Sequence, residues 1–157
     1  MTSVSVGLVT VAQALHWFAH DAFFAEVRRV SAAGVIAAWS YASCHAGDDV
    51  EPLMREFQDQ TMGPYWDERR RWVDEGYHTI PFPFAELTAP TLELHKVWTL
   101  DQLGGYLRSW SAVASYVREH GKDPVAPFLG RLGKVWGPAG HTRDIRWPLF
   151  MRVGRVG

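Results

Sequence analysis

The pattern of hydrophobic and polar positions predicts a strand, a helix and a second strand at the start of the chain. Residues 4–12 are almost continuously apolar, as in a strand that is covered on both faces. Asp21 then stands where a helix N-cap belongs, and Ala33-Gly34 ends the helix. Residues 35–41 favour a second buried strand. Apolar residues recur between the strands at helical spacing: Phe23, Phe24, Val27 and Val30. A right-handed βαβ crossover makes such strands parallel neighbours in one sheet.

The middle of the chain, residues 45–91, has a different pattern. Residues 48–62 and 65–77 are helical candidates, and Pro52 lies near the start of the first, where proline is tolerated. The stretch 80–87 that follows is broken by prolines. Such a segment between regular units is typical of a cover. We therefore expect residues 45–91 to form a helical insertion or lid within a single domain, 1–157.

The last third of the chain restores regular alternation. Residues 91–100 favour a strand, and residues 101–118 favour a helix with Thr99 as its N-cap. A shorter helix, 124–135, ends at Gly137-Pro138, and residues 143–156 form a closing strand, in which Pro148 suits an edge or a bulge. The order β-α-β, helical insertion, β-α-α-β predicts the α/β class.

Composition and charge exclude several classes of protein. With 157 residues, of which 47% are hydrophobic and 13% aromatic, the chain can bury one sizeable core. The net charge of -1 gives no electrostatic footprint for nucleic acid, and no apolar run reaches the roughly 20 residues of a membrane span. The single Cys44 excludes an internal disulfide, and "MTSVSVGLVT" lacks the basic start of a signal peptide. We expect a cytoplasmic protein without nucleic-acid or membrane partners.

The junction after the first strand carries the candidate chemistry. Gln13, His16 and Trp17 are rich in hydrogen-bonding and stacking capacity, although a short connection would be enough there. His16 precedes the predicted helix, so it does not share a helix face with His20, and we expect no metal site. The basic run at 68–72 is nearly balanced by neighbouring acids, which favours a solvated helix face.

Four segments of the sequence resemble a known family: "VTVAQALHWFAHDAFFAEVRRV", "GVIAAWSY", "YLRSWSAV" and "WPLFMRVGR". They are similar to the C-terminal half of class I S-adenosylmethionine-dependent methyltransferases, nearest to the subgroup that includes trans-aconitate methyltransferase. The resemblance implies a partial Rossmann-like sheet, in which the last strand is antiparallel. Its fourth to seventh strands would be residues 4–12, 35–41, 92–98 and 143–153.

The resemblance also implies a site. Val11, Ala12 and Gln13 would contact the cofactor S-adenosylmethionine, and His16 would orient the acceptor or act as a base. Trp17 and Trp39 would line a pocket for a small-molecule acceptor, such as a carboxylate. Two residues of the later helix would belong to the same wall, although ordinary packing is the alternative for both: Tyr106 and Trp110.

One part of the family pattern is absent from the sequence. The family holds its cofactor mainly by a Gly-rich loop after its first strand and an acidic residue after its second. Here Gly104-Gly105 lies within a helical pattern, and "GPAG" at 137–140 follows a helix. We therefore expect weak cofactor binding and no activity from this chain alone. The sequence leaves open whether a separate polypeptide supplies the N-terminal half or whether the gene is truncated. A non-catalytic remnant or a binding module is the alternative.

The missing neighbour strand would leave residues 4–12 as an edge. This stretch has no charge and no proline to oppose strand addition. We expect a homodimer through this edge, cover by residues 45–91, or aggregation.

Overall fold

A computed structural model describes residues 6–157, and the chain divides into two compact units. The first unit contains the chain up to Ser43, Arg69–Leu94 and Pro148–Gly157, and the second contains Cys44–Glu68 and His95–Trp147. Residues 45–91 are thus shared between the two units. The prediction of a single domain with a helical insertion or lid at 45–91 stays a prediction.

The elements of the first unit follow the predicted order up to residue 41. Its strands and helices are β1 (Leu8–Ala12), α1 (Leu15–Phe18), α2 (Asp21–Val30), β2 (Val35–Tyr41), α4 (Arg70–Asp74), β3 (Ala85–Leu87) and the second part of β5 (Thr142–Arg155). The second unit holds α3 (Glu51–Arg55), the π-helix η1 (Glu56–Thr61), the 3-10 helix η2 (Gly63–Tyr65), most of β4 (Leu92–Thr99), α5 (Leu100–Arg108), α6 (Ser111–His120), α7 (Val125–Trp136) and the first part of β5.

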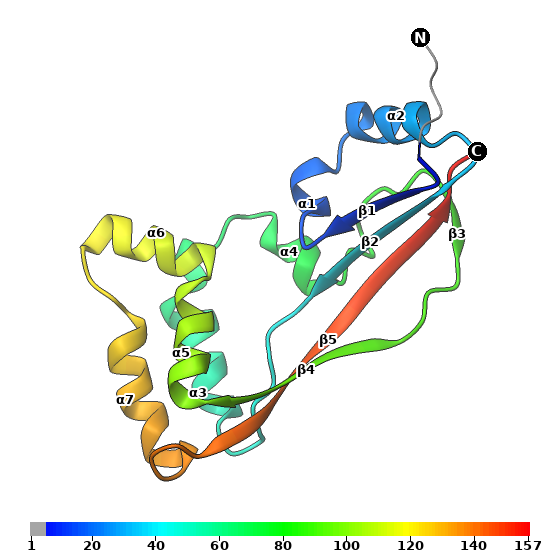
Figure 1. Cartoon of the computed structure of the whole chain (residues 1–157). Helices are drawn as coiled ribbons and strands as arrows, with labels where there is room; N and C mark the ends of the chain where they lie inside the picture. Colours follow the sequence, from blue (N-terminus) through cyan, green and yellow to red (C-terminus); the bar gives the residue numbers. More distant parts are fainter. Residues whose placement is uncertain (1–5) are drawn as a thin grey trace. The chain divides into compact units, whose positions relative to one another are not determined.

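The sheet of the first unit has the order β1-β2-β5-β3 (Figure 1). β1 and β2 are parallel, with Leu8 beside Val35 and Ala12 beside Trp39, whereas β5 is antiparallel to β2. The predicted parallel pair, its crossover helix and the antiparallel last strand are therefore confirmed, and the fold is α/β. Pro148 lies just before the ladder that begins with Leu149 opposite Tyr41, where no N–H is needed. The first residues of the predicted strand 4–12, Val4 and Ser5, lie outside the described residues.

The helix α2 covers the sheet with its apolar face. Phe24 and Val27 are buried in one core with Ile36 and Ala38 of β2, because both elements turn their periodic apolar positions to that side. The predicted N-cap was wrong by one residue. His20 is the cap, since its Nδ1 accepts a hydrogen bond from the Phe23 N–H at 3.2 Å, and Asp21 is the first helical residue.

The stretch that leads back to the sheet is less helical than predicted. Only Arg70–Asp74 of the candidate 65–77 is α-helical, and Ala85–Leu87 forms the edge strand β3 beside β5. Arg152 on β5 fixes this stretch, because its Nη1 donates to the carbonyl oxygens of Tyr77 and Ile80 at 2.9 and 2.6 Å. The prolines of residues 80–87 predict an irregular stretch, but the backbone hydrogen bonds of Ala85–Leu87 to β5 make its end a strand.

In the second unit the predicted helix 101–118 is two helices, α5 and α6. The break falls at Ser109 and Trp110: Ser109 Oγ donates to the Tyr106 carbonyl at 2.6 Å, and Trp110 is extended. The Trp110 ring is buried and packs near Phe57 and Trp66, with ring centroids 6.1 and 5.3 Å away. Thr99 caps α5 as predicted, and the Gln102 side chain completes a capping box.

The other predicted elements of this unit are present with small shifts. The helix predicted at 124–135 is α7, and residues 48–62 contain α3 followed by a π-helix, with Pro52 in the first turn. None of the helices among residues 6–157 is long and apolar enough to cross a membrane.

Candidate functional site

The carboxyl end of β1 is closed by the side chain of Gln13. Its backbone N–H donates to the Trp39 carbonyl at 2.8 Å, which is the last bond of the parallel ladder. Its side-chain oxygen then accepts from the Tyr41 N–H at 2.8 Å, and its side-chain nitrogen faces the Tyr41 carbonyl at 3.3 Å. The amide thus takes the place of one more strand residue. The backbone at Gln13 turns away with φ at 50°, and α1 begins directly afterwards.

His16 lies on the inner face of α1 and meets a tyrosine from far along the chain. Its Nδ1 is 2.9 Å from the Tyr77 hydroxyl, and both residues are buried. The neighbouring Trp17 is 45% exposed, with its ring centroid 4.9 Å from that of His16. The Arg69 guanidinium carbon lies 5.0 Å from the centre of the Trp17 ring. The junction therefore combines a buried polar pair with an exposed aromatic surface beside a cation.

Tyr77 is held by its backbone in an unusual conformation. Its φ is 65°, directly after Gly76 at 60°, and its N–H donates to the Trp72 carbonyl at 2.7 Å. Burial raises the pKa of the Tyr77 phenol to about 12, and backbone N–H groups of His16 and Leu15 oppose this rise. The phenol is therefore protonated at neutral pH and is a donor or an acceptor towards His16.

The structure places most of the predicted site residues in the first unit. Val11 is buried in the core, Ala12 is exposed, and Trp39 is half-buried beside the end of β1. Their cofactor and acceptor roles stay predictions.

The other two predicted acceptor residues, Tyr106 and Trp110, belong to the second unit. There the Tyr106 hydroxyl accepts from Trp147 Nε1 at 3.0 Å, and its ring meets Trp110 and Trp147 with centroids 5.9 and 5.4 Å away. These contacts are those of a packed aromatic cluster, which is the alternative that the sequence leaves open.

The residues expected to hold S-adenosylmethionine do not by themselves form a site for it. Both polar atoms of the Gln13 amide are used by Tyr41, and the Val11 side chain faces the core. Only Ala12 offers an exposed side chain, and it has no polar group. Their side chains supply an apolar wall and none of the side-chain hydrogen bonds that would hold a ribose or an amino acid moiety.

Sequence reasoning missed Tyr77, the partner of His16. It lies in the candidate helix 65–77 as its last residue, and nothing in the spacing links it to residue 16. The available signal was the dipeptide Gly76-Tyr77, because glycine commonly ends a helix in the left-handed conformation. Among residues 6–157 no group of three or more His, Cys, Asp or Glu side chains could hold a metal ion.

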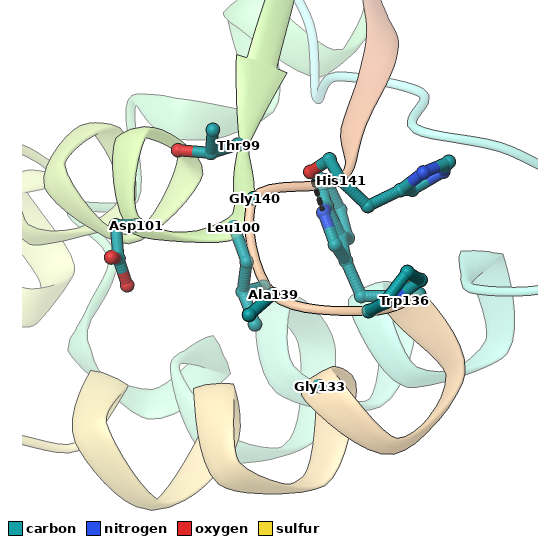
Figure 2. A pocket seen from close by; sticks show the side chains of 10 residues that line it. Thr99, Leu100, Asp101, Gly133, Trp136, Ala139, Gly140 and His141 are labelled. Atoms are coloured by element: carbon teal, nitrogen blue, oxygen red, sulfur yellow. Dashed lines mark hydrogen bonds between the residues drawn. The ribbon is translucent and has the colours of Figure 1, made fainter.

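The second unit contains a cavity of about 270 Å³ between the start of α5 and the turn after α7 (Figure 2). Thr99 and Asp101 line one side, and Trp136 and His141 line the other. Two of the polar groups here serve the fold: Thr99 caps α5, and Trp136 Nε1 donates to the His141 carbonyl at 3.0 Å. This leaves the end of β1 as the better candidate site.

Two of the proteins to which this chain is similar are described as methyltransferases. One, from Dictyostelium discoideum, is named a "putative methyltransferase"; it is 30% identical over 162 residues, which cover 99% of this chain and 62% of that protein. The other is the solved structure of a "putative type II methyltransferase" from Anaeromyxobacter dehalogenans. It is 37% identical with a TM-score of 0.87, over 99% of this chain and 67% of that one. No family model matches the sequence. The chain thus spans less than two thirds of the Dictyostelium relative.

Proposed function

The chain belongs to the methyltransferase family that these relatives represent, and on that premise we propose that the end of β1 faces the methyl acceptor of an S-adenosylmethionine-dependent enzyme. The observation that carries the proposal is the buried His16–Tyr77 pair, with Trp17 exposed beside it, directly after a parallel strand. In open α/β sheets, ligands bind outside the carboxyl ends of the strands. These side chains occupy that place in the first unit.

The proposed acceptor is a small molecule with a carboxylate. Arg69 places positive charge over the face of Trp17, and the exposed part of that ring offers an apolar surface. A carboxylate is already anionic, so its oxygen needs no base before it accepts a methyl group. The work of the chain is then to orient the acceptor and exclude water, which are large contributions to rate when reacting atoms are held in line.

The proposed cofactor is S-adenosylmethionine, which supplies an electrophilic methyl group when bound. Among the described residues, Ala12 offers the cofactor an apolar surface, while both polar atoms of the Gln13 side chain bond to the Tyr41 backbone. We propose that its polar contacts come from parts of the family fold that have no counterpart in these 157 residues. On this proposal the chain alone binds the cofactor weakly and transfers no methyl group.

A non-catalytic binding module is the second candidate. It is favoured by the contacts of Gln13, whose two polar side-chain atoms are predicted to hold the cofactor but bond to the Tyr41 backbone. The two candidates differ in what they expect of the cofactor product. Because the proposed cofactor affinity is weak, S-adenosylhomocysteine must be present at high millimolar concentration for this test. A methyltransferase site then binds its acceptor more tightly, whereas a binding module is indifferent to the cofactor product.

A titration of the whole protein, labelled with 15N at tryptophan and histidine, tests the proposal. Small di- and tricarboxylic acids should shift the Trp17 indole and His16 signals, and the matching amides should not. Trp17→Phe should abolish the response, and Trp98→Phe, a half-buried tryptophan of the second unit, is the control. Shifts confined to the second unit's tryptophans, or no shift with any acid, would overturn the acceptor site.

We also propose that the outer edge of β1 pairs with a second copy of the chain. β1 ends the strand order of the described sheet, and residues 6–12 carry no charge or proline. Thr10 is exposed on β1, so Thr10→Lys should oppose pairing without disturbing the core. Light scattering should show a dimer for the parent and a monomer for the variant. A monomeric parent at high concentration would contradict pairing. The cytoplasmic location stays a prediction.

A further inference from the structure

We propose that Tyr77 is a positioning residue that fixes His16 as the tautomer protonated at Nε2. His16 would then donate a hydrogen bond to the acceptor, and it would not remove a proton from it. This inference rests on the function proposed above for its meaning in the reaction. The tautomer itself is a property of this chain alone.

Backbone strain marks the two residues that flank His16. Among residues 6–157, Gln13 and Tyr77 are the non-glycine residues with positive φ, at 50° and 65°. A side chain with a Cβ is disfavoured in this left-handed region, and an aromatic residue there is an outlier. Gly76 shows that the chain uses glycine at the preceding position with the same conformation. Strain of this kind persists where a side chain is needed at one place, and it gathers at functional sites.

The side-chain contacts of Gln13 and Tyr77 explain why these residues, and not glycine, occupy the two strained positions. The Gln13 amide completes the ladder to Tyr41, which fixes where α1 begins. The Tyr77 phenol reaches His16 Nδ1 at 2.9 Å in a buried place. Both strained residues therefore hold the same imidazole, one through the backbone that carries it and one through its ring nitrogen.

The direction of the buried hydrogen bond follows from the chemistry of its two partners, which lie 2.9 Å apart. A phenol O–H is a strong donor and a weak acceptor, whereas the unprotonated nitrogen of a neutral imidazole is a strong acceptor. The favoured bond therefore runs from the Tyr77 O–H to His16 Nδ1. The buried Ser40 hydroxyl lies near the phenol and helps to lower its pKa, but it makes no hydrogen bond of normal length and angle with any described residue. With Nδ1 as an acceptor, the ring proton of the neutral imidazole resides on Nε2.

This tautomer selects a class of acceptor. An Nε2–H group stabilises an oxygen that offers a lone pair, as one oxygen of a carboxylate does while the other is free to react. It gives no base for a neutral hydroxyl acceptor at that nitrogen. The inference thus supports the anionic acceptor proposed above and excludes a neutral hydroxyl acceptor that would need His16 Nε2 as its base.

Long-range 1H–15N correlation spectra of the 15N-histidine-labelled protein test the tautomer without cofactor or acceptor. The His16 signals are assigned by their loss in His16→Asn. We expect Nε2–H in the parent protein and a mixture of tautomers in Tyr77→Phe. A matched control is Tyr65→Phe, which removes the hydroxyl 2.6 Å from His120 Nε2 and should leave His16 unchanged. Ser40→Ala should also leave it unchanged.

Two results would overturn the inference: an Nδ1–H signal for His16 in the parent, or an unchanged Nε2–H signal in folded Tyr77→Phe. The His16 tautomer of the parent protein is measured without the Tyr77 variant, so this test remains valid even if Tyr77→Phe does not fold. In the acid titration, Tyr77→Phe should weaken carboxylate binding about twofold, because an even mixture of tautomers leaves half of the molecules with Nε2–H. If the tautomer is as proposed and no acid perturbs His16, then the proposed function fails and the role of Tyr77 stands.

Discussion

Both units hold a tyrosine hydroxyl against a histidine nitrogen, in very different surroundings. In the first unit Tyr77 meets His16 at 2.9 Å, and His16 is only 8% exposed. In the second unit Tyr65 meets His120 at 2.6 Å, and the His120 side chain is 38% exposed. Tyr65 lies in an ordinary 3-10 turn, whereas Tyr77 has a left-handed backbone. The same two residue types at similar distances therefore form a solvent-exposed contact in the second unit and a buried contact with a strained backbone in the first.

The difference shows that burial, more than distance, decides what a polar contact is worth. Water competes for the exposed pair, so either partner can lose the other at little cost. In the core no water replaces a lost partner, and the orphaned group keeps its full desolvation penalty. A buried and strained polar pair is retained only where the surrounding structure or the function requires it.

The largest effect should come from truncating the two tyrosines. Tyr77→Ala removes a fully buried ring and leaves His16 Nδ1 without its phenol, so it should cost about 3–5 kcal/mol of unfolding free energy. Tyr65→Ala should cost less, about 1–2 kcal/mol, because its ring is only half-buried where it packs against Tyr116. Urea unfolding followed by circular dichroism measures both. Equal losses would break the comparison.

Two arginines extend the comparison to charge. The Arg152 side chain is 10% exposed and binds two carbonyls and Glu86, whereas Arg131 is 52% exposed and pairs with Glu56. Arg152→Met leaves two buried acceptors and an acid unpaired, so we expect a loss of about 2–4 kcal/mol. Arg131→Met should change stability by less than about 1 kcal/mol. The same unfolding experiment applies, and a larger loss from Arg131→Met would contradict the account.

The smallest effect is a pH dependence. Arg152 holds the pKa of the Glu86 carboxyl below its ordinary value of 4.5, so the folded state binds this proton less readily than the unfolded state. The resulting stability is present above the ordinary pKa and is lost as the pH falls through the lowered one. Arg152→Met removes the cause. Its urea midpoint should fall less steeply than that of the parent between about pH 5 and 3. Parallel slopes would show that Glu86 contributes nothing.

The sequence predicts residues 6–41 well, apart from the short helix α1, because the apolar run of a buried strand and helical spacing are local patterns there. The pattern also predicts Thr99 as a cap, and the family resemblance predicts the antiparallel last strand. The pattern misses the break between α5 and α6. Apolar spacing continues across Ser109 and Trp110, and the cause of the break is the packing of the Trp110 ring against residues from other segments.

The candidate site was predictable in only one of its two parts. Gln13, His16 and Trp17 stand out because they follow a buried strand, which is a local signal. Tyr77 is 61 positions from His16, and its positive φ opposes the preference of its own residue type. No local rule predicts that a tyrosine takes a conformation that suits glycine. Only the fold, through Arg152 and the core, brings the phenol to the imidazole.

The central claim is that this chain carries the acceptor side of a methyltransferase site and only an apolar wall for the cofactor. Calorimetric titration of the whole protein with S-adenosylmethionine tests it most directly. The account predicts no saturable heat at submillimolar cofactor, since the side chains of Val11, Ala12 and Gln13 offer no free polar group. A dissociation constant near 1 μM corresponds to about 8 kcal/mol of binding free energy, which is too much for one apolar wall, and that result would contradict the account.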